Sequence, residues 1–259
     1  MNVSNIHPTA IISPGAELAE NVTVGPFSII EDNVEIGEGT KIASTALIAE
    51  GARIGRNVTV AHGAVISTVP QDLKYAGEET TAIIGDGTTI REYATVNRGT
   101  TDKRRTKIGK NCLIMAYAHV AHDCTLGDNV IMGNACTLAG HIEIGDYAIL
   151  SGVLPIHQFV KIGAHSIIGG GYRVPQDVCP YAMAAGYPLK IAGLNIVGLK
   201  RRGFSTEVLK TLRKTFKLLF SSGLNTTQAV ARIKDEIEII SEVRVILDFI
   251  KNSERGLMK

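Results

Sequence analysis

Residues 108–150 read IGKNCLIMAYAHVAHDCTLGDNVIMGNACTLAGHIEIGDYAIL, and a large apolar side chain stands at every sixth position of this stretch. The same phase extends in both directions, because 26 of the 29 positions divisible by six from Ile6 to Val174 are Ile, Val, Leu or Met. Only Asp72, Glu78 and Asp102 break it. Gly often follows the apolar residue, and a small side chain usually stands four positions after it.

A period of six belongs neither to a helix nor to an ordinary strand, so it describes a repeat unit. One apolar residue, one small residue and a turn suit a short strand followed by a corner. Such units bury their apolar residues only by stacking into a solenoid. Three six-residue sides make a triangular coil of eighteen residues. About nine coils at the ~4.8 Å strand spacing predict a β-solenoid roughly 40 Å long.

Two insertions interrupt the repeat, at about residues 67–83 and 98–106. Loops that project from a rigid solenoid are favoured places for function. The first contains Gln71, Asp72 and Lys74, which fit either a substrate contact or a solvated turn. The second, RGTTDKRRT, is basic and fits either a phosphate contact or a mobile tip.

A proline-rich segment, residues 172–188, ends the repeat, and helical patterns follow. We expect a β-solenoid domain at 1–191 and a small α-helical domain at 192–259. Ser205 is expected to cap a first long helix, Asn225 and Gln228 to form a capping box, and Ser241 to cap the last helix. The first part of this domain is basic and could dock an acidic partner, or be a solvated face; its basic residues are Lys200, Arg201, Arg202, Lys210, Arg213, Lys214 and Lys217.

Composition excludes several classes of protein. The net charge of the 259 residues is only +2, which does not indicate a nucleic-acid binder. No apolar run reaches the ~18 residues of a membrane span, and the N-terminus lacks a signal-peptide pattern, so we expect a cytoplasmic protein. Cys112, Cys124 and Cys136 occupy small-residue positions on three sides of the coil, which disfavours zinc binding.

Histidines gather in the regular second half of the repeat. Counting in coils of eighteen places His122, His141 and His157 near one corner of three successive coils. Ligands spaced a strand apart on a rigid wall do not converge readily on a metal, so we predict proton transfer and no metal. His122 would be a general base held by Asp123, and the amide of Gly140, directly above His122 in the count, could stabilise an oxyanion.

The repeat resembles that of the hexapeptide-repeat acyltransferases, whose fold is a left-handed parallel β-helix. Within them the chain is similar to the UDP-N-acetylglucosamine (UDP-GlcNAc) O-acyltransferases of lipid A synthesis. The segments that carry this likeness are QDLKYAGE (71–78), AHVAHDCT (118–125), LAGH (138–141), HQF (157–159) and GLKRRGF (198–204). The first and last are not required by a β-helix, so they indicate the branch rather than the fold.

The resemblance implies transfer of a 3-hydroxyacyl chain from acyl carrier protein to the 3-hydroxyl of UDP-GlcNAc. The acyl group would arrive on the carrier's phosphopantetheine, and the enzyme itself would need no cofactor. His122, Asp123 and Gly140 would be catalytic, as above. The implied substrate contacts are Gln71, Asp72 and Lys74 in the first loop, His119, His141, His157 and Gln158 in the pocket, Gly170 at the end of the acyl groove, and Asn195, Arg201 and Arg202 near the phosphates or the prosthetic group.

Two departures from the family pattern concern binding. Asn97 stands where the family often has histidine, so any role there is uncharged, and Val197 replaces a frequent glutamate. The resemblance also implies a homotrimer with sites between the prisms. Two alternatives stay open: a repeat acyltransferase that N-acylates an amino sugar, and a non-catalytic β-solenoid scaffold.

Overall fold

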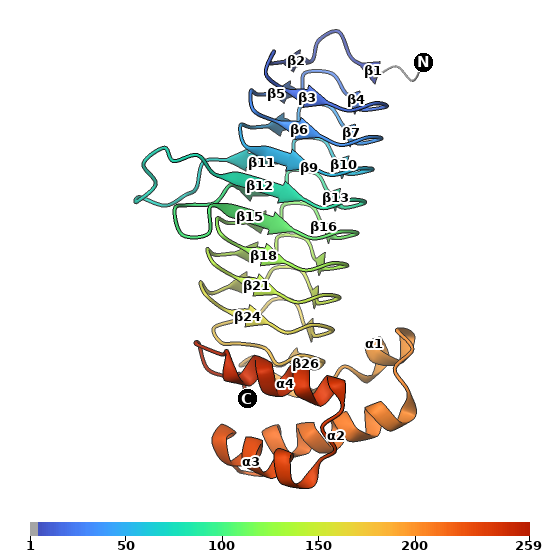
Figure 1. Ribbon diagram of the computed structural model, residues 1–259, viewed down its shortest axis with the longest axis vertical. Helices are drawn as coiled ribbons and strands as arrows, with labels where there is room; N and C mark the ends of the chain where they lie inside the picture. Colours follow the sequence, from blue (N-terminus) through green and yellow to red (C-terminus); the bar gives the residue numbers. More distant parts are fainter. Residues whose placement is uncertain (1–4) are drawn as a thin grey trace.

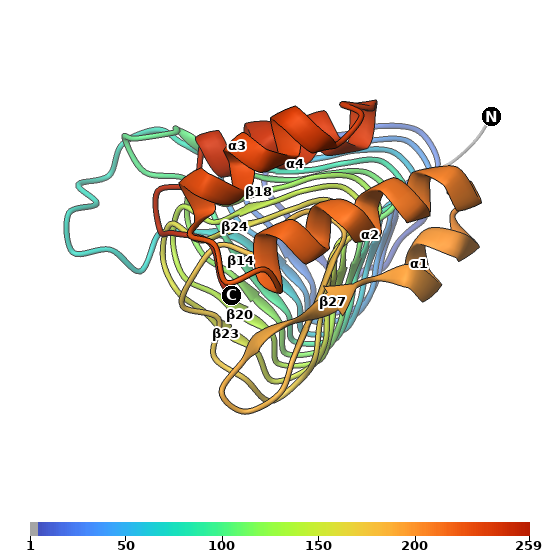
Figure 2. The same cartoon turned by 90° about the horizontal axis from the view of Figure 1, so that it is seen from below.

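The computed structural model describes residues 5–259 and forms a three-sided prism closed at its C-terminal end by helices (Figure 1). Viewed from below, the stacked coils superimpose as a triangle (Figure 2). Each side is one sheet, and consecutive strands of the chain lie on successive sides. The architecture is the left-handed parallel β-helix followed by α-helices that the sequence predicts.

The strands are short, mostly of two residues. In stacking order, the first sheet contains β1 (Asn5–Ile6), β4 (Thr23–Val24), β7 (Lys41–Ile42), β10 (Thr59–Val60), β13 (Thr89–Ile90), β16 (Leu113–Ile114), β19 (Ile131–Met132), β22 (Ile149–Leu150), β25 (Ile167–Ile168), β26 (Ala182–Ala185) and β27 (Lys190–Leu194). The second contains β2 (Ile11–Ile12), β5 (Ile29–Ile30), β8 (Leu47–Ile48), β11 (Val65–Thr68), β14 (Thr95–Asn97), β17 (His119–Val120), β20 (Thr137–Leu138) and β23 (Pro155–Ile156). The third contains β3 (Glu17–Leu18), β6 (Glu35–Ile36), β9 (Ala52–Ile54), β12 (Thr81–Ile84), β15 (Arg105–Ile108), β18 (Thr125–Leu126), β21 (Glu143–Ile144) and β24 (Lys161–Ile162).

The pairing register confirms the eighteen-residue coil. Ile131 pairs with Ile149, and Ile11 pairs with Ile29, in each case eighteen residues along the chain. Where the first insertion intervenes, Thr59 pairs with Thr89, so twelve extra residues loop out without changing the phase. Residues far apart in the chain therefore lie directly above one another.

The sixth-position residues fill the prism. Ile30, Ile66, Ile114 and Leu150 are all fully buried, while the residue before each points outward. A turn follows each strand, and its residue three positions after the apolar one usually has a positive φ, as at Asp123 (59°) and His141 (62°). The Gly just after the apolar residue has a different purpose: a Cβ at Gly37 would lie 2.6 Å from the backbone of Gly55 in the next coil.

The helices follow a strand hairpin in which β26 pairs antiparallel with β27. They are α1 (Ile196–Arg201), α2 (Thr206–Phe220), α3 (Thr226–Glu236) and α4 (Ser241–Lys251). The first helix thus begins four residues after the expected boundary at 192. Ser205 caps α2, and Asn225 with Gln228 forms the predicted capping box of α3. Among the described residues, no helix has the length and hydropathy that a membrane crossing requires.

One predicted cap was wrong. Ser241 is the first helical residue of α4 rather than its cap, and Ile240 occupies the N-cap position without a side-chain hydrogen bond. The Ser241 hydroxyl instead donates to the neighbouring Glu242 carboxylate at 2.9 Å. Because Ser241 is already helical, its oxygen does not occupy the N-cap position from which a side chain accepts from the N2 or N3 amide.

Both insertions leave the prism at one corner, between the second and third sheets (Figures 1 and 2). The first loop, residues 69–80, joins β11 to β12. The second loop, residues 98–104, joins β14 to β15. The next turns at this corner are those that carry His122 and His141, so the loops and the histidines share one edge of the prism.

Candidate active site

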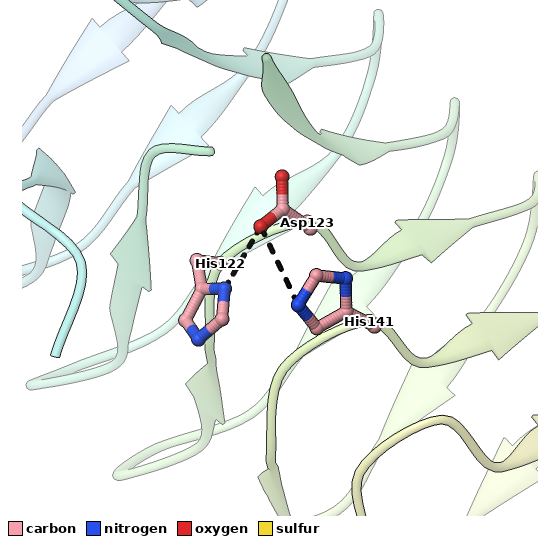
Figure 3. Close-up of side chains that lie close together, drawn as sticks. All are labelled: His122, Asp123 and His141. Carbon is pink, nitrogen blue, oxygen red and sulfur yellow. Dashed lines mark hydrogen bonds and ion pairs between the residues drawn. The ribbon is translucent and has the colours of Figure 1, made fainter. Parts of the chain in front are cut away.

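A histidine and an aspartate occupy the turn between β17 and β18. Nδ1 of His122 lies 2.8 Å from Oδ2 of Asp123, and both side chains are buried (Figure 3). An ionised carboxylate only accepts hydrogen bonds, so Nδ1 of His122 carries the proton and Nε2 is left with a free lone pair. This is the arrangement that a general base requires.

Asp123 is the most constrained side chain of the site. Its Oδ2 accepts a hydrogen bond from the Thr100 hydroxyl (2.6 Å), and its Oδ1 accepts from the amides of Thr100 (3.0 Å) and Lys103 (3.2 Å). Burial acts to raise the pKa of Asp123, but the hydrogen bonds from Thr100, His122 and Lys103 outweigh it, and the pKa lies below its ordinary value. The carboxylate is therefore charged at neutral pH.

Gly140 lies against the imidazole of His122, as the coil count predicts. A Cβ at this position would be 2.5 Å from Cε1 and 2.7 Å from Nε2 of His122. Within the part of the chain that the structure describes, the Gly140 amide donates no hydrogen bond. A free amide beside this imidazole is suited to bind an oxyanion.

His141 stands one coil below Asp123. Its ring meets that of His122 edge-on at 5.1 Å and stacks on Phe159 at 4.7 Å. Its Nε2 is 3.8 Å from Asp123 Oδ2, a distance for charge attraction rather than a hydrogen bond (Figure 3). Its Nδ1 is 3.0 Å from Asp102 Oδ2, yet the angles do not make a hydrogen bond, so we regard this contact also as electrostatic.

The absence of a metal stays a prediction, although three possible ligands come together here. One ligand atom from each of His122, Asp123 and His141 lies within 4.8 Å of the others. They converge because Asp123 and His141, eighteen residues apart, share the corner position. However, both oxygens of Asp123 already accept hydrogen bonds from the second loop and His122, which leaves little lone-pair capacity for a metal ion.

The other predicted pocket residues lie near the same edge. His119 projects from β17, where its Nδ1 is 2.7 Å from the Thr95 hydroxyl, and burial and then His122 lower its pKa. His157, in the turn after β23, donates from Nδ1 to the carbonyl of Gln158 at 3.0 Å. By the coil count His157 falls below Ala139 rather than below His122 or His141.

Asn97 and the first loop lie above the histidines on the same corner. The Asn97 amide donates to the Thr68 hydroxyl (3.0 Å) and the Val69 carbonyl (3.2 Å), while its buried Oδ1 has no partner among the described residues. In the loop, Gln71 and Lys74 are exposed, and Asp72 accepts from the Lys74 amide at 3.0 Å. Both long side chains are free to meet a ligand.

The remaining predicted contacts lie at other corners of the prism. Asn195 caps α1 and donates to the His165 carbonyl at 2.9 Å, so its side chain is already used. Arg202 donates to the carbonyl of Tyr147 and covers its ring at 5.2 Å, whereas Arg201 is exposed. These three belong to the corner between the third and first sheets. Gly170 lies at the corner between the first and second.

The sequence reasoning missed an aromatic cluster at the Arg202 corner. His165 stacks between Tyr147 (4.9 Å) and Tyr181 (5.7 Å), and Phe204 meets it edge-on. Burial and then Arg202 lower the pKa of His165. The sequence contained the signal for this cluster, because Tyr147 and His165 are eighteen residues apart and so occupy the same position in successive coils.

Comparisons with known proteins identify the family. A family model described as UDP-N-acetylglucosamine O-acyltransferase, domain 2, matches residues 177–258, and a bacterial transferase hexapeptide model matches 33–68 and 105–140. The acyl-[acyl-carrier-protein]–UDP-N-acetylglucosamine O-acyltransferase of Syntrophobacter fumaroxidans is 46% identical over 98% of this chain and 99% of its own length. The chain belongs to the UDP-N-acetylglucosamine O-acyltransferase family.

Solved structures of the family superimpose along the whole prism and the helices. The UDP-N-acetylglucosamine acyltransferase of Bacteroides fragilis has a TM-score of 0.96 at 45% identity, covering 98% of this chain and 99% of that one. The Acinetobacter baumannii structure of the same family has a TM-score of 0.95 at 44% identity, with the same coverage.

Proposed function

We propose that this acyltransferase moves a 3-hydroxyacyl chain from acyl carrier protein to the 3-hydroxyl of UDP-GlcNAc, the first step of lipid A synthesis. The observation that carries the proposal is the buried His122–Asp123 pair with Gly140 against its imidazole, at a corner flanked by two loops. Full-length likeness to relatives named for this activity supports the choice of substrates.

The reaction follows from the protonation of the pair. Nε2 of His122 takes the proton of the sugar 3-hydroxyl while that oxygen attacks the thioester carbonyl. The Gly140 amide binds the oxyanion of the tetrahedral intermediate. When the intermediate collapses, the carbon–sulfur bond breaks and His122 returns the proton to the phosphopantetheine sulfur. Asp123 stabilises the transient imidazolium throughout, and no cofactor or metal takes part.

The outward side chains of the prism support a homotrimer. The third sheet presents charged residues to solvent: Glu17, Glu35, Arg53, Lys107, Glu143 and Lys161. Parts of the other two present apolar residues that are half-buried or exposed: Ile11, Ile29, Leu47 and Val65 in the N-terminal coils of the second sheet, and Leu113, Ile131, Ile149 and Ile167 in the C-terminal coils of the first. The corner between these two sheets is also apolar, with Phe27 67% and Tyr117 63% exposed. Such a surface is typical of a protein interface.

We place this apolar corner at a three-fold axis, with the first sheet of one subunit against the second sheet of the next. The corner that bears His122 then lies beside the neighbour's corner that bears Asn195 and Arg202. Gly170 takes the inner end of the same cleft, where the absence of a side chain leaves room for the acyl chain. The residues that one chain keeps apart would thus form one site.

The exposed basic face of α2 is suited to dock acyl carrier protein. Lys210, Arg213, Lys214 and Lys217 are all exposed on this helix, whose only acidic residue is Glu207. Such a cluster attracts an acidic partner and speeds its association. Because both substrates are cytoplasmic molecules, we assign the enzyme to the cytoplasm.

Steady-state assays with 3-hydroxyacyl carrier proteins of increasing length test the reaction. UDP-GlcNAc is expected to be acylated, whereas UDP-3-O-acyl-glucosamine is not. Acylation of the latter alone would favour the N-acyltransferase alternative, and no transfer to either would favour a scaffold.

Mixing two inactive variants tests the shared site. Trimers formed from His122→Ala and Arg202→Ala chains are expected to regain about a quarter of the wild-type activity, because that fraction of interfaces is intact. Light scattering checks the assembly. A mixture as inactive as its components would exclude a site between subunits.

A further inference from the structure

The second loop, residues 98–104, contacts the site from outside the repeat. It is an insertion that the β-helix does not need, yet its backbone is well ordered by hydrogen bonds. The amide of Arg98 donates to the Thr68 carbonyl, the amide of Gly99 to the Thr81 carbonyl, and the amide of Arg104 to the Thr100 carbonyl. Gly99 and Arg105 approach so closely that a Cβ on Gly99 would collide with the Arg105 backbone. This closure turns Thr100 inward, where it is 7% exposed.

Thr100 holds Asp123 at both oxygens. Its hydroxyl donates to Oδ2 at 2.6 Å and its amide donates to Oδ1 at 3.0 Å. Oδ2 is also the atom that accepts from Nδ1 of His122. The hydroxyl oxygen of Thr100 in turn accepts from the amide of Asp102 at 3.4 Å, which leaves its proton directed at the carboxylate.

The two hydrogen bonds from Thr100, which we call the clamp, fix the Asp123 carboxylate. Without the clamp, the remaining contact from the loop to Asp123 is the Lys103 amide at 3.2 Å. A hydrogen bond to a charged acceptor in a buried site is one of the stronger kinds.

We propose that Thr100 is the positioning residue of the His122–Asp123 pair, and that the second loop serves the acyl transfer by delivering it. The inference rests on the proposed function, since the pair is taken to be the base and its partner. Thr100 touches no substrate; it acts by fixing the oxygen that orients the imidazole.

Substitution of Thr100 tests the clamp. Thr100→Val, which keeps the shape and loses the hydroxyl, is expected to lower kcat roughly tenfold to a hundredfold, with the KM for UDP-GlcNAc nearly unchanged. Thr100→Ser restores the hydroxyl and is expected to recover most of the rate. Thr101→Val, in the same loop but exposed, serves as the matched control.

The pH dependence separates positioning from simple structural damage. The hydroxyl is one of the groups that lower the pKa of Asp123, so its loss is expected to raise that pKa, which NMR titration of the Asp123 carboxyl group measures. The titratable side chains that face Asp123 are His122 and His141, while the Lys103 ammonium is engaged by Glu143 at 3.2 Å. In an Asp123→Asn background, Thr100→Val is expected to add little further loss.

A direct measurement covers the case in which the reaction itself is assigned wrongly or the valine variant is unstable. The Nδ1 proton of His122 should give a downfield NMR signal in the wild type that weakens in Thr100→Ala and persists in Thr100→Ser. A wild type that shows this signal but acylates no UDP-GlcNAc would refute the proposed function alone. Unchanged kcat in Thr100→Val, or a serine variant as poor as valine, would overturn the role of Thr100.

Discussion

Gly140→Ala places one methyl group against the proposed base. The added Cβ would lie 2.5 Å from Cε1 of His122, whereas carbon atoms in contact are separated by about 3.5–4.0 Å. The imidazole must therefore move by about 1 Å, which disturbs its 2.8 Å hydrogen bond to Asp123. A displacement of that size at a reacting group costs about a hundredfold in rate.

The assay is single-turnover acyl transfer from a 3-hydroxyacyl carrier protein to UDP-GlcNAc, with thermal unfolding measured in parallel. We expect kcat to fall about a hundredfold while the melting temperature changes little, since the methyl group faces the site and not the core. Gly15→Ala is the matched control. It lies on the same corner near the N-terminal end, where its Cβ meets only the movable Asp32 carboxylate at 2.9 Å. Wild-type activity in Gly140→Ala would refute the assignment of His122 as a precisely placed base.

Four further predictions concern the pair and the scaffold. His122→Ala should lower kcat by about 10²- to 10⁴-fold, as the loss of a general base does, with unfolding unchanged; an active variant would exclude the assignment. Because the pKa of Asp123 is lowered in the folded state, the ionised carboxylate stabilises the fold fully above the ordinary aspartate pKa, and this contribution is lost as pH falls through the folded pKa. In denaturant unfolding from pH 7 to pH 3, the free energy of unfolding of Asp123→Asn should therefore fall less steeply than that of wild type. Dialysis against a chelator should leave the transfer rate unchanged, and a rate restored only by zinc would show that the cluster is a metal site. Asn225→Ala should lower the free energy of unfolding by about 1 kcal/mol through loss of the α3 cap, measured by urea titration against the exposed control Thr227→Ala.

The β-helix could be predicted from the sequence because the place of each residue on it follows from counting in coils of eighteen residues. Ile131 and Ile149 pair as the phase requires, and the same count places Gly140 on His122. The turn residues Asp123 and His141 could have been aligned in the same way, as could Tyr147 and His165, because each pair is eighteen residues apart. The predicted column of His122, His141 and His157 fails this test, because neither pair of neighbours in it is eighteen residues apart.

The contacts made by the insertions could not be counted. Thr100 and Asp102 reach Asp123 and His141 through a loop whose path depends on local turns, such as the close approach of Gly99 to Arg105. The Ser241 cap failed for a similar reason, because the local start of α4 makes Ile240 the N-cap and Ser241 the first helical residue. The sequence period therefore predicts the β-helix, whereas the contacts of loops and helix caps depend on local hydrogen bonds that the period does not contain.

The fixed vertical spacing of the coils has a consequence for how such an enzyme can change in evolution. Inserting or deleting a single residue within a strand would turn the side chains after it to the opposite face, whereas extra residues at a corner can loop out, as they do between Thr59 and Thr89. Removing one whole coil near the N-terminus would shorten the column but keep each remaining neighbour in place. The length of the β-helix can therefore change by whole coils, and loops can be inserted at the corners. The face of the prism on which each side chain lies is under strict selection.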